Sequence, residues 1–154
     1  MISPEKKYLI KPKESVKLKK HATKESDGFK GKEDAKNALE ENIQELTDMQ
    51  RTLYAADSHA VLLIFQAMDA GGKDSTIKHV MSGINPQGCE VHSFKHPSNT
   101  ELDHGFLWRH QVVLPRRGMI GIFNRSHYEN VLISKVHPEL VMSERIPGIT
   151  STKD

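Results

Sequence analysis

The segment QAMDAGGKDS, residues 66–75, places two carboxylates around a glycine pair and a lysine, directly after the apolar run VLLIF. The carboxylates are Asp69 and Asp74, and the lysine is Lys73. In a turn between a strand and a helix, the backbone N–H groups at the helix start have no partner, and glycines let phosphate oxygens approach them. Lys73 adds a mobile positive charge. We therefore predict a phosphate-binding loop here, with a purely structural glycine turn as the alternative.

The segment matches the pattern G-x-x-x-x-G-K-[ST] with two departures. Ala67 stands where the first glycine is expected, and Asp74 where serine or threonine is expected. A strand before the loop and a helix after it provide the structural context that the pattern requires. The residues predicted to bind phosphate or nucleotide in this loop are Ala70, Gly71, Gly72, Lys73, Asp74 and Ser75.

The two carboxylates indicate a cation or a proton transfer. An ionised aspartate beside phosphate oxygens is repelled unless Mg²⁺ lies between them or the carboxylate accepts a substrate proton. Asp69 is therefore predicted to bind metal or to act in catalysis. Asp74 falls in the first turn of the predicted helix, where a carboxylate also favours the helix dipole, so a plain N-terminal role fits it equally well.

The composition is that of one soluble globular domain, with 154 residues, 36% of them apolar and 27% charged. The longest continuous apolar run, Ala60 to Phe65, has six residues, so we expect no membrane span, and the start shows no apolar signal core. These features predict a cytoplasmic protein. The single cysteine, Cys89, fits neither a disulfide scaffold nor a zinc module.

The net charge of +2 is unevenly distributed along the chain. Residues 1–32 contain ten lysines and four acidic residues, which leaves residues 33–154 with twelve basic and sixteen acidic residues. We predict a basic amino-terminal tail, residues 1–32, and a domain from residue 33 onward. Such a tail attracts polyanions by counterion release, although a merely solvated tail fits the sequence equally well.

Hydrophobic periodicity predicts helices alternating with strands, and hence an α/β fold with a parallel sheet. Apolar residues at three- and four-residue steps indicate an amphipathic helix from Glu33 to about Ala56; they are Leu39, Ile43, Leu46, Met49 and Leu53. The run from Ala60 to Phe65 is typical of a parallel strand covered on both faces. Further strands are predicted at residues 89–94 and 119–124, and helices at about 73–82 and 101–113.

Three longer segments resemble the polyphosphate kinase 2 family, close to its members that phosphorylate nucleotides: LLIFQAMDAGGKDSTIKHVMSGINPQGCEVHSFKHPS, ELDHGFLWR and LPRRGMIGIFNRSHYENVLISKVHPEL. The likeness runs from about Lys6 to Pro147, and Q-A-M-D-A is the usual loop start in that subfamily. The resemblance implies a P-loop kinase fold, Mg²⁺, inorganic polyphosphate, and nucleotides of the AMP, ADP or GDP class as partners. We further expect no membrane and no specific nucleic acid as partners, and a homo-oligomer remains open.

The resemblance also implies roles for individual residues. Asp69 and Lys73 take the Walker A role, while Asn124 and Arg125 form a second motif at the end of the third strand. Lys73 and Arg125 would supply positive charge, and Asp69 would hold Mg²⁺ or orient the acceptor oxygen, because phosphoryl transfer needs mainly positioning and charge neutralisation. Four further basic residues match positions that can meet the polyanion or be solvated: Lys95, Arg109, Arg116 and Arg117.

The chain departs from the family at two places. It has Glu129 and Asn130 where the family usually has Glu then Asp, and its last residues, GITSTKD, do not resemble the family. We therefore expect a truncated or frameshifted product, or a fragment, without the family's lid and last strands. Family topology implies that residues 61–65 have the third strand on one side and strands beyond residue 154 on the other.

The sequence as a whole predicts a polyphosphate-dependent nucleotide kinase. An ATP-dependent nucleotide kinase and a non-catalytic polyanion-binding fragment are the alternatives.

Overall fold

The computed structural model describes residues 8–22 and 28–151. The chain divides into two compact units, residues 1–36 and residues 37–154. In the first unit, the described residues include a short 3-10 helix, η1 (Leu18–Lys20), and exposed lysines on both sides of it. The second unit contains the sheet and both cavities described below.

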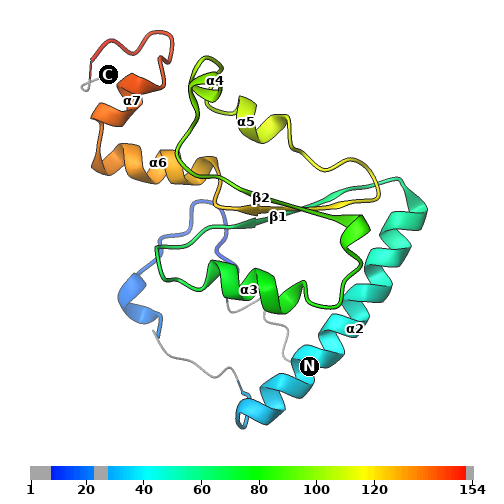
Figure 1. Ribbon diagram of the computed structural model, residues 1–154. Coiled ribbons are helices and arrows are strands. Elements are labelled where there is room, and N and C mark those ends of the chain that lie inside the picture. Colours follow the sequence, from blue (N-terminus) through cyan, green and yellow to red (C-terminus); the bar gives the residue numbers. More distant parts are fainter. Residues whose placement is uncertain (1–7, 23–27, 152–154) are drawn as a thin grey trace. The chain divides into compact units, whose positions relative to one another are not determined.

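The second unit is built on three parallel strands, which confirms the predicted α/β fold (Figure 1). The strands are β1 (Val61–Phe65), β2 (Cys89–Ser93) and β3 (Ile120–Asn124), in the order β1-β3-β2. In both pairings the strands end level, since Asn124 lies opposite Phe65 of β1 and Ser93 of β2. The carboxyl ends of all three strands therefore meet at one edge of the sheet.

Strand β3 is the buried centre of the sheet. Ile120 and Ile122 pack on one face with Ile77 of α3 (Lys73–Val80) and Leu53 of α2 (Lys32–Ala56). Phe123 points to the opposite face, where its ring meets Phe94 and His110. The alternation of adjacent residues between two covered faces is the arrangement expected of a parallel strand inside an α/β fold.

The prediction that the first strand is covered on both faces is wrong for this chain. Val61 and Ile64 of β1 are 40% and 39% exposed. Only Leu63 and Phe65 contact the core cluster. The reason is position, because β1 is an edge strand among the residues that the structure describes.

Helix α2 confirms the predicted amphipathic helix with one change to its buried stripe. Leu39, Ile43, Leu46 and Leu53 are half-buried, but Met49 is exposed and Gln50 is buried instead. Four residues separate Leu46 from Gln50, and three separate Gln50 from Leu53, so Gln50 falls on the packed face. Its side chain occupies the space beside Gly88 that a Cβ there would fill.

The helix predicted at residues 101–113 is wrong, because two short helices lie there: α4 (Asn99–Leu102) and α5 (Trp108–Gln111). A capping box formed by Ser98 and Glu101 starts α4 earlier than predicted. Gly105 then interrupts the run, since glycine inside a helix costs about 1 kcal/mol relative to alanine.

Three further elements had no counterpart in the sequence prediction: η2 (Pro86–Gly88), α6 (His127–Val136) and α7 (Glu139–Ser143). Among the described residues, no helix combines the length and apolar character needed to cross a bilayer.

Burial of His110 makes stability depend on pH. This side chain of α5 is only 5% exposed, and desolvation lowers its pKa from 6.5 to about 4, with help from the positive charges of Arg109 and His127. Between these two pH values only the unfolded chain takes up the proton. The contribution of His110 to the free energy of unfolding is therefore unchanged above pH 6.5 and falls as the pH drops from 6.5 towards 4, by about 3 kcal/mol.

In a His110→Phe variant, the free energy of unfolding measured with a chemical denaturant should no longer show this fall between pH 6.5 and 4. His79→Gln, at an exposed position of α3, serves as the control and should keep it. An unchanged pH profile in His110→Phe would assign the effect to other groups.

Candidate functional site

The loop between β1 and α3 takes a conformation that few sequences allow. Ala70 and Gly72 have positive φ angles of 60° and 82°. A Cβ on Gly71 would lie 2.8 Å from the carbonyl oxygen of Met68, so only glycine fits there. Gly72 is the N-cap of α3 and has no capping side chain, which leaves the first N–H groups of the helix available to an anion.

Lys73 is held inside this loop. Its ammonium donates hydrogen bonds to the carbonyl oxygens of Ala67, at 2.8 Å, and Met68, at 3.0 Å. The residue is only 9% exposed. The expectation of a mobile charge is therefore wrong for this structure, because the lysine folds back on its own loop and places a fixed positive charge beneath it.

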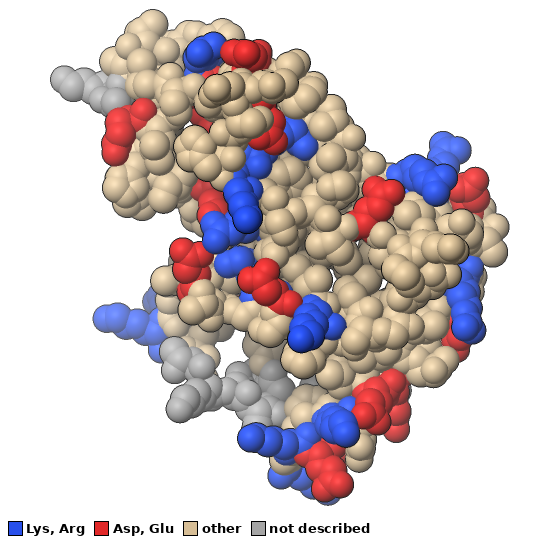
Figure 2. Space-filling model, viewed as in Figure 1, with Lys and Arg blue, Asp and Glu red and all other residues tan. Residues whose placement is uncertain are grey.

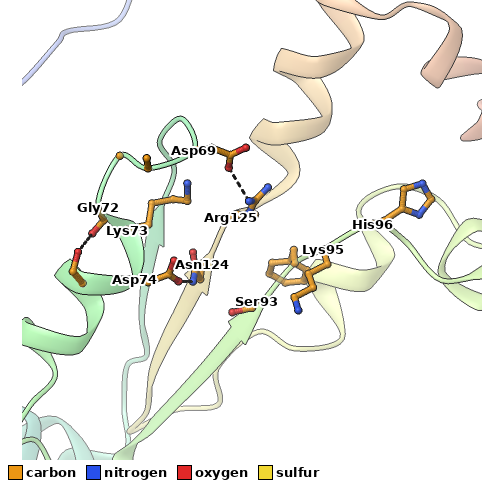
Figure 3. A pocket seen from close by; sticks show the side chains of 13 residues that line it. Asp69, Gly72, Lys73, Asp74, Ser93, Lys95, His96, Asn124 and Arg125 are labelled. Atoms are coloured by element: carbon orange, nitrogen blue, oxygen red, sulfur yellow. Dashed lines mark hydrogen bonds and ion pairs between the residues drawn. The ribbon is translucent and has the colours of Figure 1, made fainter.

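A cavity of about 670 Å³ opens beside the loop (Figure 3). Its walls come from the loop, from the start of α3 and from the carboxyl ends of β2 and β3. The structure brings ten predicted site residues to it: Asp69, Ala70, Gly71, Gly72, Lys73, Asp74, Ser75, Lys95, Asn124 and Arg125. Figure 2 shows basic and acidic side chains close together on this face between α3 and α6.

Two side-chain contacts join the loop to the end of β3. Arg125 Nη2 lies 2.9 Å from Asp69 Oδ1, and Asn124 Nδ2 donates to Asp74 Oδ1 at 2.6 Å (Figure 3). The two predicted motifs, which are about fifty residues apart in sequence, therefore face each other across the cavity. The Asn124 contact also gives the Asp74 carboxylate a hydrogen-bond partner in addition to its interaction with the dipole of helix α3.

Arg125 has an unusual backbone conformation. Its φ angle is +69°, a region that non-glycine residues seldom adopt and that costs of order 1–3 kcal/mol. Its backbone N–H donates to the carbonyl oxygen of Phe65 at 3.0 Å, which continues the β1–β3 pairing one step beyond the strands. The turn directs the guanidinium towards Asp69 and also towards Glu129 of α6.

A second cavity, of about 270 Å³, adjoins the first and shares four lining residues with it: Phe94, Lys95, His96 and Arg125. Its remaining wall combines apolar side chains, including Leu102, Ile133 and Leu140, with hydroxyl groups of α6 and α7. Arg109, Glu129 and Glu144 also line it, so this cavity differs from the first in its apolar side chains and not in its number of charged residues. Arg125 lies where the two meet.

Arg109, predicted to meet the polyanion, lines the second cavity rather than the first. Its side chain is largely buried, with Nε 3.2 Å from Glu101 Oε1 and Nη2 donating to Lys95 O at 2.9 Å. The guanidinium also lies over the ring of Phe94. These contacts fix Arg109 as part of the wall beneath Lys95.

Arg116 and Arg117 lie outside both cavities. They stand in the exposed turn before β3, at the amino end of that strand, whereas the loop lies at its carboxyl end. Of the two interpretations that their sequence allowed, the structure favours solvated charges.

Asn130, the residue that departs from the usual family sequence, belongs to the second cavity. Its Nδ2 donates to Glu144 Oε1 at 2.9 Å and so connects α6 to the segment after α7. An aspartate there would place two carboxylates in contact. The amide of Asn130 thus provides the hydrogen-bond donor that Glu144 needs. Asn130 does not line the cavity beside the loop.

Sequence reasoning missed several residues of the site: Gln66, Ser93, Phe94, His96, Ser126 and, as a contact of Arg125, Glu129. Ser93 and Phe94 end or follow β2, so the rule that open parallel sheets bind ligands at strand carboxyl ends could have found them. No comparable sequence signal marks the Gln66–Glu129 contact, which joins residues 63 positions apart.

The carboxylates of the cavity suit a cation that the substrate helps to bind. Among residues 8–22 and 28–151, no cluster of three or more His, Cys, Asp or Glu side chains could hold a metal by itself. Mg²⁺, however, is usually bound by one or two carboxylates together with substrate phosphates. Asp69, whose side chain is 88% exposed at the cavity, and Asp74 fit that donor set.

A parallel sheet with a glycine loop and helix after its first strand, and with the site at the strand carboxyl ends, defines an α/β fold of the P-loop kinase type. The family model of Polyphosphate kinase 2 (PPK2) matches residues 30–145. The chain therefore belongs to the polyphosphate kinase 2 family, as its sequence predicted.

Individual relatives agree with this assignment. An ADP-polyphosphate phosphotransferase of Rhodopseudomonas palustris is 55% identical over 143 residues, which cover 93% of this chain and 50% of the relative. An AMP/ADP-polyphosphate phosphotransferase of Meiothermus ruber is 43% identical, over 91% of this chain and 54% of the relative. The chain thus spans about half the length of the curated relatives it matches.

A solved structure is also similar. The crystal structure of polyphosphate kinase 2 from Arthrobacter aurescens TC1 aligns with a TM-score of 0.75 at 36% identity, over 84% of this chain and 48% of that chain.

Proposed function

We propose that this chain carries the phosphoryl-transfer site of a polyphosphate-dependent nucleotide kinase, which moves a phosphoryl group between inorganic polyphosphate and a nucleoside mono- or diphosphate. The observation that carries the proposal is the junction of two unlike cavities at Arg125. One cavity is lined by a phosphate-binding loop and charged side chains, and the other is smaller and partly apolar. A polyanion fits the first, and an acceptor with a nucleoside fits the second.

The residues of the first cavity would act mainly by position and charge. Lys73 stabilises the loop from below and neutralises phosphate charge, while the free N–H groups at the start of α3 bind phosphate oxygens. Arg125 would bind the transferring group at the junction. Lys95, which also lines both cavities, adds positive charge on the β2 side.

Asp69 and Asp74 would hold Mg²⁺. Such an ion would supply positive charge that offsets the negative charge of the phosphates. Asp69 would then have to give up its ion pair with Arg125. Because the Asp69 side chain is highly exposed, losing that ion pair costs little free energy.

The acceptor nucleotide is proposed to lie in the second cavity with its phosphate towards Arg125. AMP, ADP or GDP would each present an apolar base and a polar ribose, which match the mixed wall of leucine, isoleucine and serine side chains. Relatives named as acting on AMP, ADP and GDP support this range of acceptors.

One experiment separates this function from its alternatives. The purified chain is given AMP or ADP with Mg²⁺ and either polyphosphate or ATP, and the phosphorylated nucleotide is measured. Product with polyphosphate supports the proposal, and product with ATP alone indicates an ATP-dependent nucleotide kinase. Binding of polyphosphate without product from either donor indicates a non-catalytic polyanion-binding fragment.

Polyphosphate binding is expected to weaken steeply as the salt concentration rises, because Lys and Arg side chains replace condensed counterions. The basic tail adds to this effect if it takes part. Seven lysines in its described part form no ion pair among the residues that the structure describes, and five of them lie within residues 8–22: Lys11, Lys13, Lys17, Lys19 and Lys20. Deleting residues 1–32 should lower the log–log salt slope by about one per contacting lysine.

Changing these five lysines to glutamine tests the charges without shortening the chain and should lower the slope in the same way. An unchanged slope in both variants would make the tail a solvated arm. Binding that does not depend on salt would contradict the electrostatic interpretation of the whole site.

A further inference from the structure

Glu129, in the first turn of α6, connects the ends of two neighbouring strands. Its Oε1 accepts a hydrogen bond from Arg125 Nη1, and its Oε2 accepts one from Gln66 Nε2 at 3.2 Å. Gln66 directly follows β1, and Arg125 directly follows β3. One carboxylate therefore holds side chains from both strand ends.

Arg125 is shared between two carboxylates that differ in their surroundings. Its Nη2 pairs with Asp69, whose side chain is 88% exposed on the loop. Its Nη1 pairs with Glu129, whose side chain is 37% exposed and has Gln66 as a second partner. Exposed ion pairs contribute about 0–1 kcal/mol, so the Asp69 contact is the one that an arriving phosphate can displace.

We propose that Glu129 is a positioning residue for phosphoryl transfer. It holds Arg125 Nη1, so that the guanidinium stays at the junction of the two cavities when Nη2 passes from Asp69 to a phosphate oxygen. Gln66 orients the Glu129 carboxylate from the other side. The inference rests on the proposed function, because it assumes that polyphosphate binds beside Arg125.

The direction in which polyphosphate affinity changes when Glu129 is removed distinguishes a positioning role from a simple charge effect. Glu129 carries a negative charge close to the site of a polyanion, so by Coulomb's law alone its removal should strengthen polyphosphate binding. If Glu129 instead holds Arg125 in place, its removal should weaken binding, because the guanidinium then has to be ordered by the ligand.

The test measures binding of tripolyphosphate with Mg²⁺ to the 154-residue chain by calorimetry. Glu129→Gln keeps the size of the side chain and removes its charge, and it is expected to weaken binding about threefold or more. Glu139→Gln is the control for charge. That glutamate, on α7, lines neither cavity and contacts His137 rather than an arginine, so its removal should leave binding equal or tighter.

A double-mutant cycle shows whether Glu129 acts through Arg125. In an Arg125→Ala background, Glu129→Gln should cause no further weakening, whereas a general structural role would weaken binding equally with or without the arginine. Glu129→Asp provides a second variant if Glu129→Gln fails to fold. It keeps the charge but shortens the side chain, so positioning predicts weaker binding and a charge effect predicts none.

Equal or tighter binding by Glu129→Gln, or the same weakening in the Arg125→Ala background, would overturn the inference while leaving the proposed function intact. No binding of tripolyphosphate or longer polyphosphate by the unaltered chain would overturn the proposed function and this inference with it.

Discussion

In a Lys73→Ala variant, phosphoryl transfer from polyphosphate to AMP or ADP should fall at least about tenfold, since removing one charge partner of a transition state commonly costs a few kcal/mol. The structure gives a specific reason for this size. The ammonium of Lys73 is buried under the loop and donates to two of its carbonyl oxygens, at 2.8 and 3.0 Å. The variant therefore loses a positive charge next to the phosphates and also the two hydrogen bonds that hold the loop in its conformation.

Lys78→Ala is the matched control, because Lys78 lies on the same helix and is exposed. Thermal unfolding of both variants shows whether any loss reflects folding. Polyphosphate affinity is measured alongside turnover, so that the comparison still holds if transfer by the short chain is slow. Unchanged turnover and affinity in a folded Lys73→Ala variant would remove Lys73 from the site.

The sheet and the loop could be predicted from the sequence because both depend on neighbouring residues. VLLIF and MIGIFN are short branched or aromatic runs bounded by turn residues, and their strand character is local. The glycine pair before Lys73 likewise marks a turn at a helix start. Ten of the thirteen predicted site residues consequently line one cavity.

The contacts that define the site chemically could not be read in this way. Arg125 meets Asp69 across 56 positions, and Gln66 meets Glu129 across 63, so both depend on strand order rather than on local pattern. The burial of Lys73 was missed for a related reason. A lysine is usually solvated, and only the tight turn of Ala70 and Gly72 brings the loop carbonyls above its ammonium.

The two edges of the sheet differ in how well they resist association. Strand β2 carries Glu90 and is followed within two residues by Lys95, whereas VLLIF of β1 has no charged residue and no proline. Charges on edge strands are the common means by which natural sheets avoid pairing with other chains. Among the described residues, β1 pairs only with β3, which confirms one predicted neighbour and leaves the other side without a strand.

We therefore expect the 154-residue chain to self-associate at micromolar concentration through β1 and to transfer phosphoryl groups only slowly. The exposed apolar face of α6, with Leu132 and Val136, adds to the first effect. The second follows because the first cavity is not enclosed, and water weakens the electrostatic contacts that transfer requires. Sedimentation velocity over a range of concentrations measures the association. Ile64→Lys should reduce this association strongly and Val91→Lys, on β2, only weakly, because only the first variant places the new charge on the unprotected edge strand.

A chain of the relatives' length, about twice as long, should remain dispersed and turn over at least about tenfold faster. Sedimentation as a monomer at every concentration, together with turnover equal to that of the longer chain, would mean that residues 1–154 already form a complete and covered site.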